Sequence, residues 1–116
     1  MLVRIDPSSG VPLAAQIAAQ VRGAVAAGQV AAGDRLPAAR DLADGLQVNM
    51  HTVLRAYAQL RDEGLIELRR GRGATVRGDE AADRARLVDA THHLLAAARR
   101  LGLNLDELVA EVRRLA

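Results

Sequence analysis

Residues 34–77 read DRLPAARDLADGLQVNMHTVLRAYAQLRDEGLIELRRGRGATVR, and this stretch decides the fold. A short helical pattern follows Pro37 and runs to Gly45, and so few residues need tertiary support to stay helical. Asn49 suits an N-cap, and it opens a second helix that ends before Gly64. Residues 45–48 between the two helices have the length and the glycine of a helix-turn-helix. The inward face of the second helix is expected to carry Val53, Leu54, Tyr57 and Leu60.

A basic hairpin follows directly. Residues 65–68 have the pattern of a strand, the turn at 71–73 contains two glycines, and residues 74–76 supply the returning strand. No acid occurs between residues 68 and 78, where the basic residues are Arg69, Arg70, Arg72 and Arg77. Two helices joined by a tight turn and followed by a hairpin predict a winged helix-turn-helix, whose second helix enters the major groove of DNA. The basic hairpin is its wing, and it favours contact with the DNA backbone or the minor groove.

The residues before position 34 predict one strand and one helix. Val3 and Ile5 alternate with polar neighbours, which favours a short strand before the turn signals at 7–10. A helix is expected from near Pro12 to Gly28, and its apolar stripe belongs to a core. The expected fold is mainly α with a small β-hairpin, and residues 1–77 form the winged helix-turn-helix domain. The stripe consists of Leu13, Ile17, Ala18, Val21 and Val25.

Residues 78–116 predict a two-helix tail. The first helix follows Gly78 and breaks at Gly102, and the second starts at Asn104, which makes a capping box with Glu107. Each helix has an apolar stripe, and two helices cannot bury both stripes alone. Part of that surface could pack on the winged helix, but a two-fold dimer is the expected solution, so the tail is interpreted as a dimerisation element. The expected dimer contacts are Leu94, Leu101, Leu105, Leu108, Val109 and Val112.

Composition excludes several classes of protein. The 116 residues contain no cysteine, so neither a disulfide framework nor a thiolate metal site is expected. All 16 residues counted as lysine or arginine are arginine, and the net charge is only +2. Because the chain as a whole is nearly balanced in charge, the basic hairpin is a local positive patch. No apolar run reaches the roughly 18 residues of a membrane span, and a signal-peptide core is lacking. A cytoplasmic protein without a membrane partner is expected.

Residues that could carry chemistry are few. His92 and His93 are adjacent, and side chains one position apart on a helix point about 100° apart, so a shared metal ion is not expected. The turn at 71–73 is followed by a strand and not by a helix, which argues against a nucleotide loop. No arrangement suggests a nucleophile with its base. We therefore expect no metal, no cofactor and no enzymatic activity.

Four segments in order, LPAARDLA, VNMHTVLRAY, LRDEGLIE and GRGATV, resemble the DNA-binding domain of GntR-type bacterial transcription regulators. The resemblance covers residues 1–77. The combination of TV at residues 52–53 with AY at residues 56–57 is most similar to sequences of the YtrA subgroup. That subgroup lacks a large effector-binding domain and has a short two-helix tail that makes a dimer. The resemblance thus implies a homodimeric regulator. We expect a repressor that acts by obstruction, since no part of so short a chain looks dedicated to recruiting polymerase.

The resemblance also implies which residues meet DNA. Arg40 corresponds to an arginine that contacts DNA in the family, and Arg35 precedes the same motif. The helix opening and the wing tip correspond to further contacts. The sequence departs from relatives at Met50 and Leu54, where arginines are frequent, and Arg55 follows the second of these. The full set of expected DNA contacts is Arg35, Arg40, Asn49, Met50, His51, Thr52, Arg55, Arg70, Gly71 and Arg72.

Each assignment has a plainer alternative. Arg40 could pair with Asp44 one helical turn later, Asn49 could serve as an N-cap alone, and Tyr57 is more typical of a core than of a stacking platform.

The predicted target is a partly palindromic DNA operator, because a dimer presents two recognition helices. The competing functional class is a winged-helix protein-interaction module whose basic wing binds an acidic partner. A small-molecule effector would bind between the tail and the winged helix or across the dimer.

Overall fold

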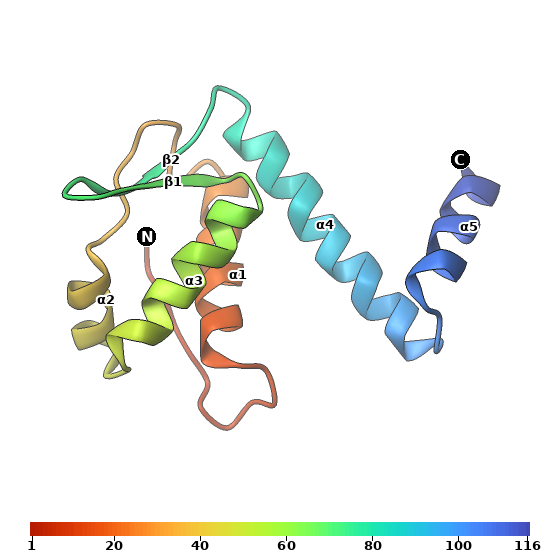
Figure 1. Ribbon diagram of the computed structural model, residues 1–116, viewed down its shortest axis with the longest axis horizontal. Helices are drawn as coiled ribbons and strands as arrows, with labels where there is room; N and C mark the ends of the chain where they lie inside the picture. Colours follow the sequence, from red (N-terminus) through yellow and green to blue (C-terminus); the bar gives the residue numbers. More distant parts are fainter.

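Five helices and one hairpin follow one another along the chain, whose computed structural model describes residues 1–116 (Figure 1). Their order confirms the expected mainly helical fold with a small β-hairpin. Helices α1 to α3 and the hairpin gather together, and α4 leads away from them to α5 at the far end. The elements are α1 (Leu13–Ala26), α2 (Ala39–Leu46), α3 (Met50–Asp62), β1 (Ile66–Arg69), β2 (Gly73–Val76), α4 (Ala81–Arg100) and α5 (Leu105–Leu115).

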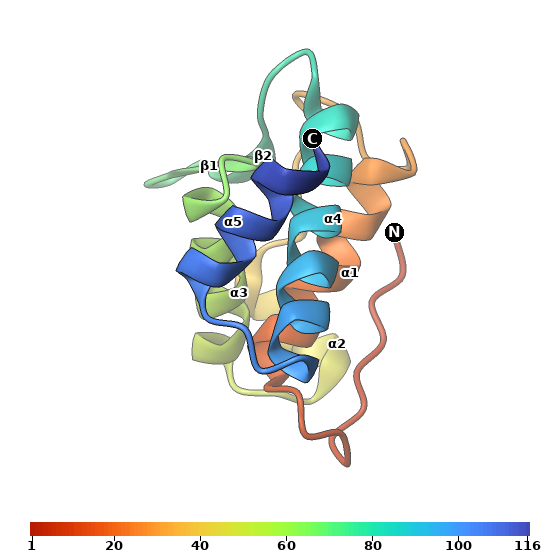
Figure 2. The ribbon, with the colours of Figure 1, turned by 90° about the vertical axis from the view of Figure 1, so that its right-hand side faces the viewer.

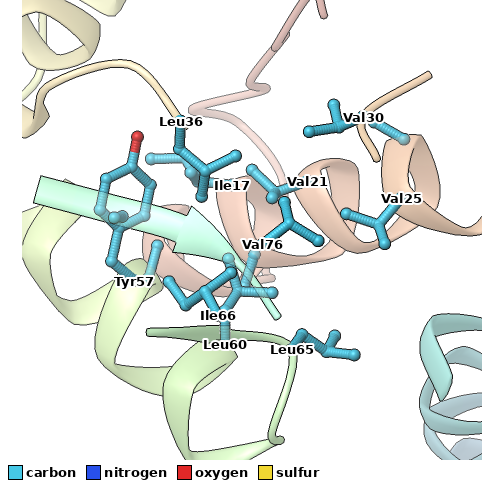
Figure 3. Packing of buried hydrophobic residues seen from close by; sticks show 14 of the residues in the cluster. Ile17, Val21, Val25, Val30, Leu36, Tyr57, Leu60, Leu65, Ile66 and Val76 are labelled. Atoms are coloured by element: carbon cyan, nitrogen blue, oxygen red, sulfur yellow. The ribbon is translucent and has the colours of Figure 1, made fainter. Parts of the chain in front are cut away.

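The core is built on α1, which packs against both α3 and α4. Ile17, Val21 and Val25 lie one helical turn apart and are almost completely buried, as the apolar stripe predicted. Leu60 of α3 and Ile66 of β1 lie on the opposite side of this cluster (Figure 3). The hydrophobic effect of covering this stripe holds the helices and the hairpin together.

The turn between α2 and α3 differs from the sequence expectation in its pivot. Gly45 was expected to make the turn, but it lies inside α2, and Gln47 adopts the left-handed conformation with φ of 56°. Gln47 compensates for this unfavourable conformation because its side-chain amide donates to the carbonyl of Asp44 at 2.8 Å. The amide of Val48 donates to the carbonyl of Ala43, which closes the end of α2.

The wing is attached to the body along one edge. Strands β1 and β2 pair antiparallel, with Ile66 opposite Val76. The other edge of β2 bonds to residues 33–36, since the amide of Leu36 donates to the carbonyl of Ala74 and the amide of Val76 donates to that of Asp34. The loop before α2 and the wing therefore form one ribbon, and the position of α2 is tied to that of the wing.

The expected strand at Val3 and Ile5 is absent, and that prediction was wrong. The backbone amides of Arg4 and Asp6 donate to the side-chain oxygens of Gln20 and Gln16 on α1. Glutamine side chains thus accept the hydrogen bonds of these backbone amides, as a neighbouring strand would do in a sheet. The alternation of apolar and polar residues could not reveal that side chains, and not a neighbouring strand, bond to these amides.

The tail is not detached from the winged helix. Ala81 and Ala85 of α4 are buried members of the main core, so the first half of α4 completes the body formed by residues 1–77. In Figure 2, α4 lies across α1. Helix α5 packs extensively on no other element, and its N-terminus has the expected capping box between Asn104 and Glu107. No helix is both long and apolar enough to cross a membrane.

Tyr57 connects the two helices of the motif. It is buried on α3, and its hydroxyl donates to the carbonyl of Pro37 at 2.7 Å, just before α2 begins. Burial raises the pKa of Tyr57 to about 12. Because the chain has one tyrosine, no lysine and no cysteine, no other side chain normally titrates near pH 10.

We expect Tyr57→Phe to lower the free energy of unfolding by about 1 kcal/mol near neutral pH, since it leaves the Pro37 carbonyl without its partner. Because the pKa of Tyr57 is higher in the folded protein than in the unfolded chain, ionisation of the phenol favours unfolding. The contribution of Tyr57 to stability is therefore complete below pH 10 and is lost as the pH rises toward 12. Urea unfolding of both proteins from pH 8 to 12 measures this. An equal loss of stability in both proteins over pH 10–12 would contradict it.

Candidate nucleic-acid interface

The start of α3 is capped by Asn49. Its backbone is extended, and its side-chain oxygen accepts a hydrogen bond from the amide of His51 at 2.8 Å. The cap uses one oxygen of the amide and leaves the side-chain NH₂ group free to donate. His51 is exposed beside it. The first turn of α3 thus presents polar side chains outward, as the sequence indicated.

The helical phase of α3 divides the expected contacts into exposed and covered residues. Arg55 is exposed, and so is Leu54, which corrects the expectation that Leu54 faces inward. Thr52 is only 9% exposed because it shares a helix face with the buried Ala56. Met50 is half-buried and packs against the core. The outward face of α3 therefore begins with Asn49, His51, Leu54 and Arg55.

Arg40 lies in the first turn of α2 and is exposed. The alternative of an ion pair with Asp44 is not realised, since Arg40 makes no salt bridge or side-chain hydrogen bond in the structure. Its guanidinium is therefore unpaired and accessible on the helix that precedes the turn.

The wing tip carries three of the predicted residues, Arg70, Gly71 and Arg72. Gly71 and Gly73 both have positive φ, at 77° and 75°, which explains why glycines occur at this turn. Arg70 and Arg72 have no acidic partner, whereas Arg69 pairs with Glu67 at 3.4 Å. The two arginines nearest the tip are thus the free ones.

Arg35 lies beneath the wing and supports it. Its guanidinium donates to the backbone carbonyl of Arg72, and its backbone bridges to Thr75. Sequence reasoning placed Arg35 among the DNA contacts but missed this link to the wing tip. No local pattern in the sequence indicates this hydrogen bond, because Arg35 and Arg72 are 37 residues apart.

These parts lie on one side of the molecule. In Figure 1, α2, the start of α3 and the wing tip all lie to the left, and α4 and α5 lie to the right. Arg40 of α2, Arg55 of α3, and Arg70 and Arg72 of the wing tip have no acidic partner, and neither has Arg35 beneath the wing. A helix end flanked by unpaired cations can meet both base edges and phosphates.

Comparison with known proteins places this geometry in a family. The family model described as bacterial regulatory proteins, gntR family, matches residues 13–76, more than half of the chain. The chain belongs to the GntR family. The matched region of this GntR protein runs from α1 to the end of β2, and it contains every residue assigned above to the candidate interface.

Individual relatives agree with this assignment. The GntR protein is 40% identical over 75 residues to the HTH-type transcriptional repressor YtrA of Bacillus subtilis, a match that covers 65% of the chain and 58% of that relative. It is 38% identical over 101 residues to the HTH-type transcriptional regulator Rv1152 of Mycobacterium tuberculosis, covering 87% and 83% of the two chains. Among solved structures, YtrA of Sulfolobus acidocaldarius, a GntR-family transcription factor, is 35% identical, with a TM-score of 0.63 over 97% and 95% of the chains. A protein named YtrA thus occurs in both comparisons, among the sequence relatives and among the solved structures.

The cap role of Asn49 can be tested separately from DNA binding. Asn49→Ala should lower the free energy of unfolding by about 1 kcal/mol, because the amide of His51 loses its acceptor. Asn49→Asp keeps an equally good acceptor and should stay close to the parent protein in stability. Chemical denaturation of the three proteins measures this, and a similar loss in both variants would mean that the cap is not what the side chain contributes.

Proposed function

We propose that this GntR protein is a sequence-specific DNA-binding transcription regulator that acts as a homodimeric repressor on a partly palindromic operator. In this proposal α3 enters the major groove and the wing enters the minor groove. The observation that carries it is the common placement of the α3 start and the unpaired wing arginines on one side of the molecule (Figure 1). Family membership supports the coarser statement that the chain is a DNA-binding regulator.

The exposed residues at the start of α3 supply the readout of bases. His51 and the free NH₂ group of Asn49 can donate to base edges, and Arg55 lies one turn further along the exposed face. Met50 is half-buried and Thr52 is almost covered, so we assign these two side chains to seating the helix rather than to reading DNA. The readable surface is thus shorter than the sequence pattern suggested.

Arginines outside α3 supply the contacts that orient the protein. Arg40 in the first turn of α2 can bind a phosphate or a base edge on the near side of the groove. Arg70 and Arg72 at the wing tip can enter the minor groove, and Gly71 lets the backbone approach closely. Arg35 contributes by holding the wing tip, and it retains further N–H groups for a phosphate.

A second copy of the chain covers the apolar face of the tail. Leu101 and Leu105 are 77% and 66% exposed at the corner between α4 and α5, and Val112 is 45% exposed further along α5. Isolated apolar side chains at a surface are ordinary, but a contiguous row on two adjoining helices indicates an interface. A two-fold dimer pairs this row with itself and places two α3 helices on the DNA. The further exposed members of the row are Leu87, Leu94, Val109 and Leu115.

Leu108 differs from the other tail residues. It is 7% exposed and so is already covered within its own chain, outside the main core, as is Ala98. We therefore assign Leu108 to the packing of the tail itself. A polar substitution there would disturb folding of the tail, and it cannot serve as a clean probe of dimerisation.

Repression by obstruction is the simplest mode of action for this arrangement, and a relative at 40% identity is named a transcriptional repressor. The protein-interaction alternative needs apolar anchors at the exposed start of α3. Leu54 is the only large apolar side chain that α3 exposes, and the exposed, unpaired Arg55 follows it directly. The charge of this surface favours a polyanion.

The structure offers little support for a small-molecule effector site. A hollow of about 500 Å³ lies between the end of α3 and the start of α4, in the region expected for such a ligand. Leu65 and Ala81 are its only apolar lining residues, and Arg77 and Arg84 face it together with two acids. Ligand sites are usually lined mainly by apolar side chains, so our proposal includes no effector.

We expect Arg40→Ala to weaken operator binding by about 1 to 3 kcal/mol while folding and dimerisation persist. If Arg40 binds a phosphate, the slope of log affinity against log salt concentration should also fall by about 1. Fluorescence anisotropy at several salt concentrations measures both quantities. The matched control is Arg61→Ala, at the opposite end of α3, which should leave affinity unchanged. Operator affinity that is the same in Arg40→Ala and the parent removes Arg40 from the interface.

Val112→Asp should convert the dimer to a monomer and weaken binding to a full operator by roughly 100-fold or more, since the second half-site no longer binds intramolecularly. Binding to a single half-site should be unchanged. Ala110→Asp adds the same acid at an exposed position on the opposite face of α5 and should remain dimeric. Analytical ultracentrifugation and anisotropy test this, and a Val112→Asp dimer at micromolar concentration would place the interface elsewhere.

A further inference from the structure

A buried ion pair joins α1 to the end of α3. Arg22 is only 2% exposed, although it lies on the apolar face of α1, between Ala18 and Val25. Its partner is Glu63, the C-cap residue of α3. The guanidinium donates to the carboxylate in a two-pronged arrangement, with Nε to Oε1 at 3.2 Å and Nη2 to Oε2 at 3.0 Å. Such geometry fixes both the distance and the angle between the two helices.

Helix α4 joins the same carboxylate. The ring Nε2 of His92 lies 2.6 Å from Oε2 of Glu63, and the carboxylate of Asp89 lies 3.9 Å from Nη1 of Arg22. Gln59, one turn earlier on α3, also donates to Oε2. We call Arg22, Glu63, Asp89 and His92 the Glu63 node. The node connects the central helix, the recognition helix and the tail at one point.

The other contacts between α4 and the body cannot fix its direction equally well. The buried α4 residues in the main core are Ala81 and Ala85, which are small, and the partly buried Val88 packs against the same core near the end of the second turn. Apolar contacts are non-directional, so these three side chains hold α4 against α1 but fix its direction less sharply than hydrogen bonds do. The node lies further along α4, at His92, and its hydrogen bonds are directional. It therefore acts as the second point that a rigid attachment requires.

The length of α4 magnifies any change at this attachment. A helix of 20 residues spans roughly 30 Å, so a rotation of about 10° about its first turn moves its far end by roughly 5 Å. The base-pair spacing of DNA is about 3.4 Å, and the site rotates about the axis with each step. A small rotation of α4 therefore changes which half-site spacing a dimer can reach.

We propose that the Glu63 node is a positioning device that sets the spacing between the two half-sites read by the dimer. Glu63, with Arg22 and His92, fixes the angle between α3 and α4, and the tail carries that angle to the second protomer. This inference rests on the proposed function, since it needs a dimer that binds two half-sites. The node residues touch no DNA in this arrangement, and they act through the placement of α3.

The test is the affinity of the full-length protein for operators whose spacer is shortened or lengthened by one and two base pairs. The variant is the double substitution His92→Ala/Asp89→Ala, which frees α4 from the node and leaves the buried Arg22–Glu63 pair intact. The control is Asp83→Ala/Arg86→Ala, which removes an exposed ion pair from the same helix. Affinity for a single half-site is measured alongside for all three proteins.

The parent and the control should prefer one spacing, and the node variant should lose that preference by roughly tenfold, because a pivoting tail spreads the effective concentration of the second α3 over several spacings. Half-site affinity should be the same in all three. An unchanged spacing preference in the node variant overturns the proposal. Absence of any preference for a full operator over a half-site in the parent overturns the proposed function instead.

A second measurement needs no DNA. The chain has no cysteine, so Arg55→Cys introduces a single site for a spin label on the exposed face of α3. The distance between the two labels in the dimer should have a narrow distribution in the parent and control backgrounds. The distribution should broaden or shift when His92 and Asp89 are replaced. Equal distributions in all three backgrounds would show that apolar packing alone holds α4.

Discussion

Burial of the apolar stripe on α1 is the constraint on which the rest of the structure depends. Ile17, Val21 and Val25 must be covered, and two different elements cover them: α3 with the hairpin from one side and α4 from the other. Helix α3 and the tail are thus held by the same surface. A chain of this size buries a limited area, so losing either cover exposes much of the core.

Most of the architecture could be predicted from the sequence because it follows from local rules. The periodicity of residues 13–26, the N-cap at Asn49, the glycine turn at 71–73 and the capping box at Asn104 each depend on neighbours a few positions away. The main errors involve partners that are distant in sequence. The first residues of the chain alternate like a strand, but two glutamines of α1 satisfy their amides. The error at the turn is local, because Gln47 and not Gly45 adopts the left-handed conformation there.

The candidate site could be predicted in outline and not in detail. The family resemblance indicated Arg40, and charge and position indicated Arg70 and Arg72 at the wing tip. The structure leaves these three side chains without acidic partners, whereas Arg69 pairs with Glu67. Adjacent side chains of a helix point about 100° apart, so His51 is exposed while Thr52 is covered, and the sequence pattern could not settle which positions of α3 face outward. The one signal of the buried ion pair in the sequence is that Arg22 lies on the apolar stripe of α1. Its acidic partner is 41 residues away, so nothing local identified it.

The ribbon formed by the wing and the loop before α2 has a further consequence for association. Strand β2 is paired on both edges, by β1 on one side and by residues 33–36 on the other. Of the two strands, only β1 therefore keeps an open edge, and it is four residues long and carries Glu67 and Arg69. Short, charged edges resist the addition of strands from other molecules. Copies of this chain are consequently protected from edge-to-edge aggregation through the hairpin.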